Sequence, residues 1–156
     1  MPQSLARARN AAYRLLAYRD RSIFEIRTAL KKKGFLNKEI ENVIEKLTVD
    51  GYLDDSKFAL NYGGSLLRNK KAGPRYVEHR LYVKGVEKEL ARKTVEGLFC
   101  DPDIQKREIM GWIEKKKKSF KKGLTPMQKK KRIYDFLVRR GFSFDLIMQS
   151  LKAVSQ

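Results

Sequence analysis

The sequence predicts an all-α protein made of three tandem three-helix repeats, about nine helices in total. Apolar residues recur at spacings of three and four along nearly the whole chain. Helix start and stop signals alternate at short intervals. One turn pattern, in which a Leu precedes a Gly by four positions and an apolar residue follows the Gly, occurs at residues 30–35, 81–86 and 137–142.

The helix after each of these turns also repeats its pattern. Counted from the glycine, positions +6, +10 and +13 are apolar in all three copies: Ile40, Ile44 and Leu47, then Ala91, Val95 and Leu98, then Ile147, Leu151 and Val154. Helical periodicity alone does not determine where a glycine falls, so the shared turn and face indicate a true repeat. We place the repeats at residues 1–53, 54–100 and 101–156.

The first repeat is expected to hold three amphipathic helices. The apolar spacing begins at Ala8, and the first helix ends shortly before the next start signal. Ser22 and Glu25 form a capping box that starts the second helix, which ends at Gly34. Asn37 is expected to cap the third helix.

The junction between the first two repeats begins at Gly51, which can adopt the left-handed conformation that ends a helix. Asp54 then caps the next helix, Asp55 lies at the positive end of its dipole, and Leu53 with Phe58 forms a hydrophobic staple. The Asp pair could instead contribute to a divalent metal site, but no His or third carboxylate follows at ligand spacing. We expect no metal and no cofactor.

A basic loop, residues 68–74, interrupts the second repeat. Pro74 at its end is suited to the first position of a helix. The side chains of Lys70, Lys71 and Arg75, beside Gly73, could contact phosphate there, aided by the helix N-terminus. The same loop could also be merely solvated. The sequence leaves both interpretations open.

The third repeat opens with Asp101 and Pro102, a cap followed by a residue suited to the first helical position. Thr125 and Gln128 form a second capping box. Ser143 is expected to cap the last helix.

Charge is the most unusual property of the composition. The chain has 36 Lys and Arg against 18 Asp and Glu, a net charge of +18, so a polyanion, and nucleic acid first, is the expected partner. Residues 105–156 alone hold fifteen basic and four acidic side chains. Their clusters comprise Lys115, Lys116, Lys117, Lys118, Lys121, Lys122, Lys129, Lys130, Lys131 and Arg132. These are too dense to be paired internally, so they either bind a polyanion without sequence preference or form a solubilising face.

Several functional classes find little support. A single Cys, Cys100, excludes an intramolecular disulfide, and it has only one His, His79, with which to share a zinc ion. No signal peptide, apolar run of membrane-spanning length, Gly-rich phosphate loop or hydrolase motif is evident, so a cytoplasmic protein without enzymatic activity is expected. A nuclease would need four carboxylates from separate junctions to converge: Asp54, Asp55, Asp101 and Asp103.

A helix-turn-helix is a closer structural alternative. The turn glycine is followed by apolar residues at +6 and +9, here Ile40 and Val43, and basic charge suits DNA. The position four before the glycine normally holds a small residue, whereas all three copies have Leu. We therefore expect a helical pair of related geometry.

The chain resembles the RecX family of regulatory proteins. The resemblance rests on Arg21 with Ser22, on residues 30–34, 51–59 and 81–85, and on the turn at Gly73. It implies a curved, elongated array of three-helix repeats that binds the RecA recombinase filament on single-stranded DNA. Such a protein would modulate, and by expectation inhibit, ATP hydrolysis and strand exchange in recombination and DNA repair.

The resemblance also suggests where the partners bind. A monomer would lie along the filament groove and hold protomers apart, with its junctions against protein and its basic clusters against nucleic acid. The candidate partner-binding residues are Asp54, Asp55, Lys57, Arg68, Lys70, Lys71, Arg75 and Lys84. The alternative is a general single-stranded DNA- or RNA-binding helical repeat protein with no recombinase target.

Overall fold

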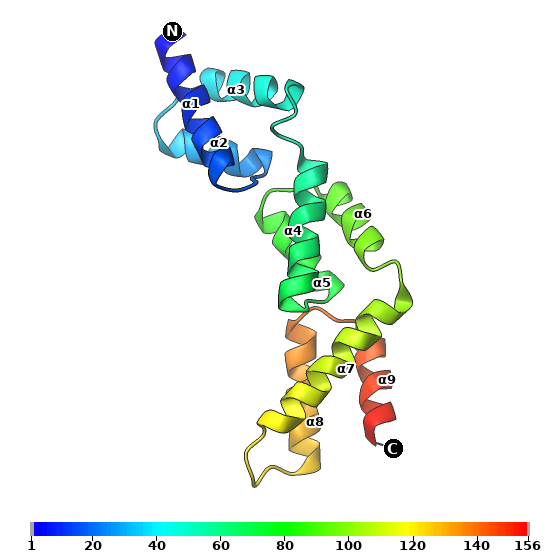
Figure 1. Cartoon of the computed structure of the whole chain (residues 1–156). Helices are drawn as coiled ribbons and strands as arrows, with labels where there is room; N and C mark the ends of the chain where they lie inside the picture. The colour runs from blue at the N-terminus through cyan, green and yellow to red at the C-terminus, as the bar shows by residue number, and fades with distance from the viewer. Residues whose placement is uncertain (1, 156) are drawn as a thin grey trace. The chain divides into compact units, whose positions relative to one another are not determined.

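The computed structural model describes residues 2–155, and within them the regular structure is entirely α-helical (Figure 1). The helices are α1 (Pro2–Tyr18), α2 (Ile23–Lys32), α3 (Asn37–Val49), α4 (Asp55–Lys70), α5 (Pro74–Val83), α6 (Lys88–Leu98), α7 (Pro102–Ser119), α8 (Pro126–Arg139) and α9 (Phe144–Ser155). Nine helices and no strand in this range confirm the predicted fold class. None of these helices combines the length and apolar content needed to cross a bilayer.

The three repeated turns have the same backbone geometry. Their glycines have positive φ angles: 93° at Gly34, 81° at Gly85 and 88° at Gly141. The N–H of the residue after each glycine donates to the carbonyl oxygen of the Leu that precedes the glycine by four, from Phe35 to Leu30, from Val86 to Leu81 and from Phe142 to Leu137. Each turn thus satisfies helix-end carbonyls as glycine-terminated helices do. The prediction of equivalent turns is confirmed.

Most predicted helix starts are also confirmed. The Ser22 hydroxyl accepts the Glu25 N–H at 3.1 Å, and the Glu25 carboxylate accepts the Ser22 N–H at 3.2 Å, which completes the capping box of α2. Thr125 and Gln128 form the same box at α8. The remaining caps are side-chain acceptors at Asp54, Asp101 and Ser143, which start α4, α7 and α9.

The predicted cap at Asn37 is wrong. Asn37 is the first residue inside α3, and Leu36 occupies the capping position with extended backbone. Leu36 has no side-chain acceptor, so the start is stabilised from the other side, where the Glu39 carboxylate accepts the Leu36 N–H at 2.9 Å. The side chain that stabilises the start of α3 is therefore that of Glu39 and not that of Asn37.

The chain divides into two compact units. Unit 1 comprises Met1–Tyr62 and Leu81–Ala91, and unit 2 comprises Gly63–Arg80 and Arg92–Gln156. Helices α4, α5 and α6 therefore contribute to both.

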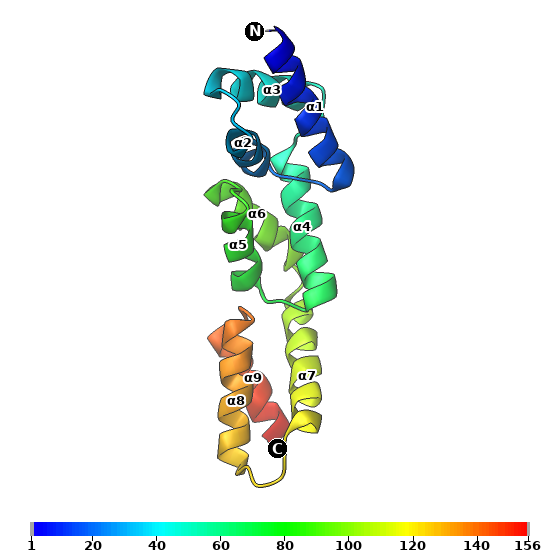
Figure 2. The same ribbon diagram turned by 90° about the vertical axis from the view of Figure 1, so that its left-hand side faces the viewer.

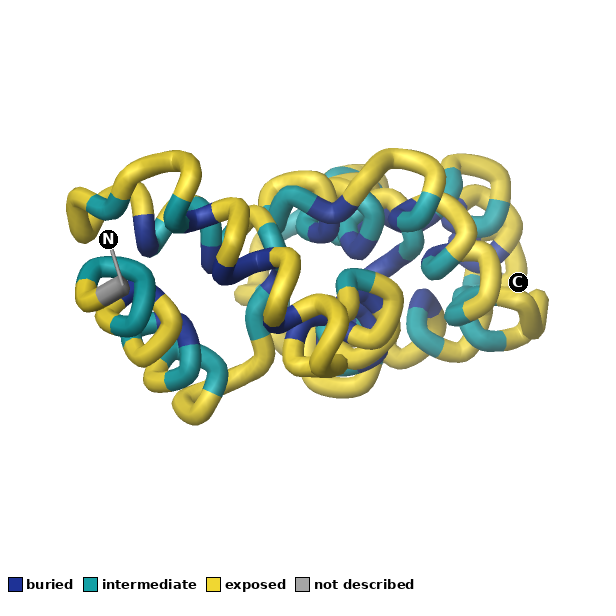
Figure 3. Tube along the Cα trace, turned by 90° about the horizontal axis from the view of Figure 1, so that it is seen from above, coloured by how far each residue is buried: buried dark blue, intermediate teal, exposed yellow. Residues whose placement is uncertain are grey.

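The core of unit 1 lies among α1, α2 and α3 (Figure 1). Ala8 and Ala12 are fully buried on α1, and their small side chains allow the other helices to approach closely. The buried positions follow one side of each helix, as the dark blue segments in Figure 3 show. Residues +6, +10 and +13 from Gly34 are all buried, as predicted.

The core of unit 2 lies among α7, α8 and α9, which pack against one another (Figure 2). Ile109 and Ile113 face this core from α7, and Ile133 and Leu137 face it from α8. Phe142, directly after the turn glycine, is almost fully buried. This core lies within the C-terminal part of the chain, where residues 105–156 carry +11 of the net charge of +18.

Candidate nucleic-acid interface

The ten clustered cations of the third repeat all lie around the connection from α7 to α8. We call them the basic surface: Lys115, Lys116, Lys117, Lys118, Lys121, Lys122, Lys129, Lys130, Lys131 and Arg132. The first four lie at the end of α7, the next two in the connecting loop, and the last four in α8. Among residues 2–155, no carboxylate forms an ion pair with any of them.

Part of the basic surface lines a groove of about 710 Å³. Lys116, Lys121, Lys122 and Arg132 contribute to its walls. The other lining groups include Arg139, the acid Asp135 and the rings of Phe120 and Phe136. Cations beside aromatic rings suit a single strand, whose phosphates need positive charge and whose bases stack on rings.

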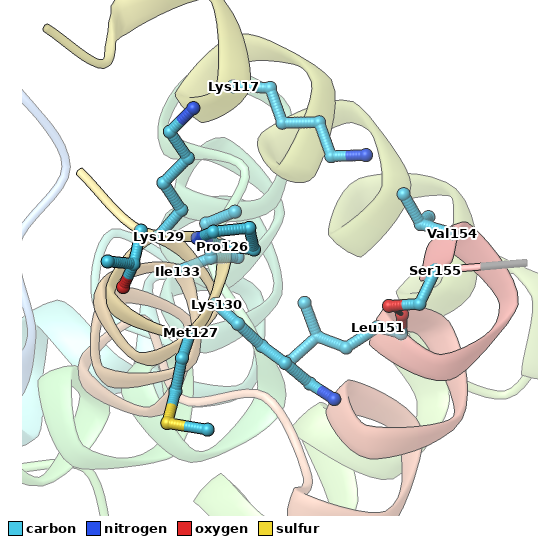
Figure 4. Close-up of a pocket in the computed structure, with 10 residues that line it drawn as sticks. Lys117, Pro126, Met127, Lys129, Lys130, Ile133, Leu151, Val154 and Ser155 are labelled. Atoms are coloured by element: carbon cyan, nitrogen blue, oxygen red, sulfur yellow. Dashed lines mark hydrogen bonds between the residues drawn. The ribbon is translucent and has the colours of Figure 1, made fainter. Parts of the chain in front are cut away.

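A second hollow, of about 750 Å³, has a different character (Figure 4). Lys117, Lys129 and Lys130 surround it. Its walls are otherwise largely apolar and include Pro126, Met127, Ile133, Leu151 and Val154. Of the ten cations, Lys115, Lys118 and Lys131 line neither hollow.

Two members of the basic surface, Lys115 and Lys116, belong to a cluster of aromatic rings and cations. The rings of Trp112 and Phe136 meet edge to face with centroids 4.9 Å apart. The Arg140 guanidinium lies 4.7 Å from the Trp112 centroid, Lys116 Nζ lies 4.0 Å from that of Phe136, and Lys115 Nζ lies 5.2 Å from that of Trp112. Sequence reasoning missed this cluster, although Trp112 with Lys115 and Lys116 has the spacing of one helix face.

The basic loop before α5 is held by unit 2 itself. Trp112 Nε1 donates to the Lys71 carbonyl oxygen at 2.9 Å, and Lys71 has a positive φ of 50°. The N–H of Gly73 donates to the Arg140 carbonyl at 2.7 Å, and the N–H of Arg75 donates to that of Gly141 at 3.0 Å. Two backbone donors that a phosphate would need are therefore already used. Any phosphate contact here would depend on side chains, and those of Arg68, Lys70, Lys71 and Arg75 are all exposed. Lys71 Nζ lies 4.0 Å from the Glu108 carboxylate.

The junction between the first two repeats lies in unit 1. Asp54 is exposed, and its carboxylate accepts the N–H groups of Ser56 at 2.9 Å and Lys57 at 3.3 Å, which confirms it as the cap of α4. Asp55 does more than interact with the dipole of α4. Its carboxylate accepts the N–H of Ile23, the first residue of α2, at 2.9 Å, so it also caps a helix from another repeat.

Asp55 is half-buried, and its surroundings change its pKa. Burial raises the pKa of Asp55 above its ordinary value, and the nearby charges of Asp54 and Glu25 add to this effect. The hydrogen bond from Ile23 and the charge of Arg27 act in the opposite direction.

Lys84 also contacts the first turn of α2, through Glu25. Its Nζ lies 3.0 Å from the Glu25 carboxylate, and Arg19 Nη1 also lies 3.0 Å from that carboxylate. Burial alone would raise the pKa of Glu25, but hydrogen bonds from Arg19, Lys84 and the Ser22 N–H lower it below its ordinary value. Capping predicted only the Ser22 contact, because the residues that pair with Glu25 come from outside its own helix.

Within residues 2–155, no group of three or more His, Cys, Asp or Glu side chains is placed to hold a metal ion. His79 and Cys100 are both exposed.

Two family models match this chain, and both describe three-helix domains of RecX. Residues 8–47 match the family model of the first three-helix domain of RecX, and residues 108–151 match that of the third. Together these matches cover more than half of the chain.

Two curated relatives carry the name Regulatory protein RecX. The one from Bacillus licheniformis is 35% identical over 137 residues, covering 88% of this chain and 51% of the relative. The one from Bacillus velezensis is 34% identical over 146 residues, covering 94% and 54%. The chain thus spans about half the length of the curated relatives it matches.

Solved structures share the fold. The crystal structure of RecX from Lactobacillus salivarius aligns with a TM-score of 0.87 over 99% of both chains, at 21% identity. A second crystal structure, of regulatory protein RecX, aligns with a TM-score of 0.81 over 92% of this chain and 69% of the other, at 19% identity.

Proposed function

Because the chain belongs to the RecX family, we propose that it binds the RecA recombinase filament on single-stranded DNA and inhibits the filament's ATPase and strand exchange. Such a protein regulates recombination and DNA repair in the cytoplasm and needs no catalytic group of its own. The named relatives are regulators, which supports this role.

The observation that carries the nucleic-acid part is the basic surface. Ten cations around one helix connection have no carboxylate partner among residues 2–155, so phosphate can approach them without breaking an ion pair. Each phosphate neutralised would release counterions, which favours binding at low salt whatever the base sequence. Aromatic rings in the groove beside Lys116 add a means of contacting unstacked bases.

We assign the protein contact to the junction between the first two repeats and to the basic loop. Asp54 and Lys57 are exposed there, and Asp54 offers carboxylate oxygen beyond its two capping bonds. Asp55 and Lys84 support this surface from inside unit 1. Many weak contacts made by one monomer along the filament would hold protomers apart and slow their ATP hydrolysis.

The test is a titration of the chain into recombinase filaments formed on single-stranded DNA, with ATPase rate as the readout. We expect inhibition well below one chain per protomer, because one bound chain affects its neighbours. A general single-stranded DNA- or RNA-binding protein would inhibit only when it coats the strand, and excess free oligonucleotide would then relieve the inhibition in proportion. That second pattern would contradict the recombinase target and leave a nucleic-acid-binding protein.

A further inference from the structure

In each unit, the start of one helix lies against the turn between two later helices. In unit 1 the first turn of α2 meets the turn at Lys84 and Gly85. In unit 2 the first turn of α5 meets the turn at Arg140 and Gly141. The second helix of one repeat therefore contacts the glycine turn of the next, and the contact occurs twice.

The hydrogen-bond acceptors of the two contacts are equivalent. The residue directly before each turn glycine presents its carbonyl oxygen to the start of the incoming helix. The Ser22 hydroxyl donates to the Lys84 carbonyl, and the Gly73 N–H donates to the Arg140 carbonyl at 2.7 Å. Each donor residue directly precedes the first residue of its helix.

The packing of the incoming helix against the turn glycine is also alike in the two contacts. A Cβ added to Gly85 would overlap the Phe24 side chain, and one added to Gly141 would overlap the backbone nitrogen of Tyr76. In each case an aromatic residue from the first turn of the incoming helix covers the glycine. In unit 1 an ion pair completes the contact, between Lys84 and Glu25 at the third position of α2.

The turn at Gly34 has the same backbone but no incoming helix. Its φ is 93°, and, apart from Gly34 itself and its two chain neighbours, no atom of the described residues lies within 4 Å of an added Cβ. Lys33 precedes this glycine as Lys84 precedes Gly85, and Lys31, Lys32 and Lys33 are all exposed. Leu36, two residues after the glycine, is 68% exposed.

We propose that the turn at residues 33–34 is a docking site for the start of a helix from an acidic protein partner. The partner helix would present a donor at its cap, an aromatic residue in its first turn and a carboxylate at its third position. The donor would meet the Lys33 carbonyl, the aromatic ring would cover Gly34, and the carboxylate would pair with Lys33. This inference does not depend on the proposed action on a recombinase.

The charges favour a different protein over a second copy of this chain. In a second copy, the second helix of the last repeat is α8, whose first turn contains no acid. Lys129, Lys130 and Lys131 follow directly. These would face the three exposed lysines at residues 31–33, and like charges at such a contact oppose association.

A suitable probe is a lactam-stapled helical peptide with the sequence of residues 20–30, because this segment already occupies the equivalent turn within unit 1. The peptide ends before the three lysines at residues 31–33, which would repel the same lysines of the chain. It is titrated into the isotope-labelled full chain, and amide shifts are followed by NMR. We expect saturable shifts at Lys33, Gly34 and Phe35, with the amides of Gly85 and Gly141 unchanged.

Charge variants provide the controls. Lys33→Glu in the chain should weaken peptide binding about five-fold, the upper range for a partly exposed ion pair, and Arg14→Glu, an equal charge change on α1, should leave it unchanged. Replacing the peptide's own acid, Glu25→Lys, should weaken binding at least as much. Three results would each overturn the proposal: no saturable shift at residues 33–35, equal effects of the two chain variants, or shifts at Gly85 that indicate displacement of α2.

Discussion

The three turn glycines share a positive φ but differ in what surrounds them. Around Gly34 an added Cβ would meet no described atom, whereas at Gly85 it would overlap the Phe24 side chain and at Gly141 the backbone of Tyr76. Backbone strain is therefore common to all three, and steric exclusion applies only to two.

We expect the three Gly→Ala substitutions to differ in the free energy of unfolding. Gly34→Ala should cost about 1 kcal/mol, the strain of a positive φ alone. Gly85→Ala and Gly141→Ala should each cost at least about 2 kcal/mol, because the incoming helix must also move. Gly141→Ala should be the most severe, since backbone yields less than the Phe24 ring. Urea unfolding measures all three, and equal losses would contradict the assigned contacts.

The two acids of the first junction should respond differently to substitution. Asp54→Asn should be nearly silent in stability because Asn caps as well as Asp, whereas Asp54→Ala should cost about 1 kcal/mol. Asp55→Asn should also be mild, since an amide oxygen can still accept the Ile23 N–H and the raised pKa shows that ionisation is disfavoured here. Asp55→Ala should cost about 1 to 3 kcal/mol because it leaves that donor unsatisfied.

Thermal melts measure these effects, and inhibition of the recombinase ATPase tests the partner role in parallel. If the junction contacts the filament, the double Asn variant should melt like the parent and inhibit less. Unchanged inhibition would make the junction purely structural.

Local chemistry was readable from the sequence, and contacts between distant segments were not. Ser22 and Glu25 are three residues apart, so their capping box follows from the sequence alone. The Lys84 contact to Glu25 and the Asp55 contact to Ile23 depend on how successive repeats meet. Asn37 shows that even local reasoning fails when a better acceptor, Glu39, stands two residues away.

At the scale of one element, the start of α2 concentrates the electrostatics of unit 1. The Glu25 carboxylate receives Arg19, Lys84 and the Ser22 N–H, and these contacts lower its pKa. A carboxylate whose pKa is lower in the folded state stabilises the protein above its unfolded pKa. That contribution is lost as pH falls through the folded value.

We therefore expect Glu25→Gln to destabilise the chain at neutral pH and progressively less below about pH 4.5, where the parent carboxylate also becomes protonated. Gln retains the capping contact, as Gln128 shows at α8, so the difference isolates the ion pairs. Asp55, whose pKa is raised, acts with the opposite sign, and the Glu25 charge is one cause of that rise. Both proteins are therefore compared in an Asp55→Asn background, in which this contribution is absent. Melting temperatures of parent and variant across pH give the result, and a constant difference would contradict it.

Capping boxes and turn glycines predict both ends of α2 and α8, but they do not predict which surface the extra length exposes. Between these signals α8 has 14 residues where α2 has 10. The extra turn places Met127 at 81% exposure, beside the hollow shown in Figure 4. A surface of this kind depends on how far a helix extends beyond its neighbours, which apolar periodicity does not report.

For the whole molecule, the uneven distribution of charge is the property with the clearest functional consequence. Residues 105–156 carry +11 of the net +18. Replacing Lys115–Lys118 and Lys129–Lys131 with Gln should weaken single-stranded DNA binding for every base sequence. It should also flatten the salt dependence, by roughly 0.7 in log–log slope for each phosphate that the variant no longer neutralises.

A control with equal charge removed elsewhere makes this result specific. Its seven substitutions to Gln fall on exposed cations of unit 1: Arg7, Arg9, Arg14, Lys31, Lys32, Lys33 and Lys38. Fluorescence anisotropy of a labelled oligonucleotide at several salt concentrations gives both slopes. If the two variants lose the same slope, net charge rather than the basic surface determines binding.

The sole tryptophan adds an optical consequence to the aromatic cluster. Trp112 is half-buried, its ring is approached by Arg140 and Lys115, and its N–H is held by the Lys71 carbonyl. Indole emission depends on nearby charge and on solvent, so an anion that draws Lys115 away from the ring changes the emitted light. Unlabelled protein therefore carries an intrinsic fluorophore beside its candidate interface, and stopped-flow emission at this one residue can time the arrival of a nucleic acid.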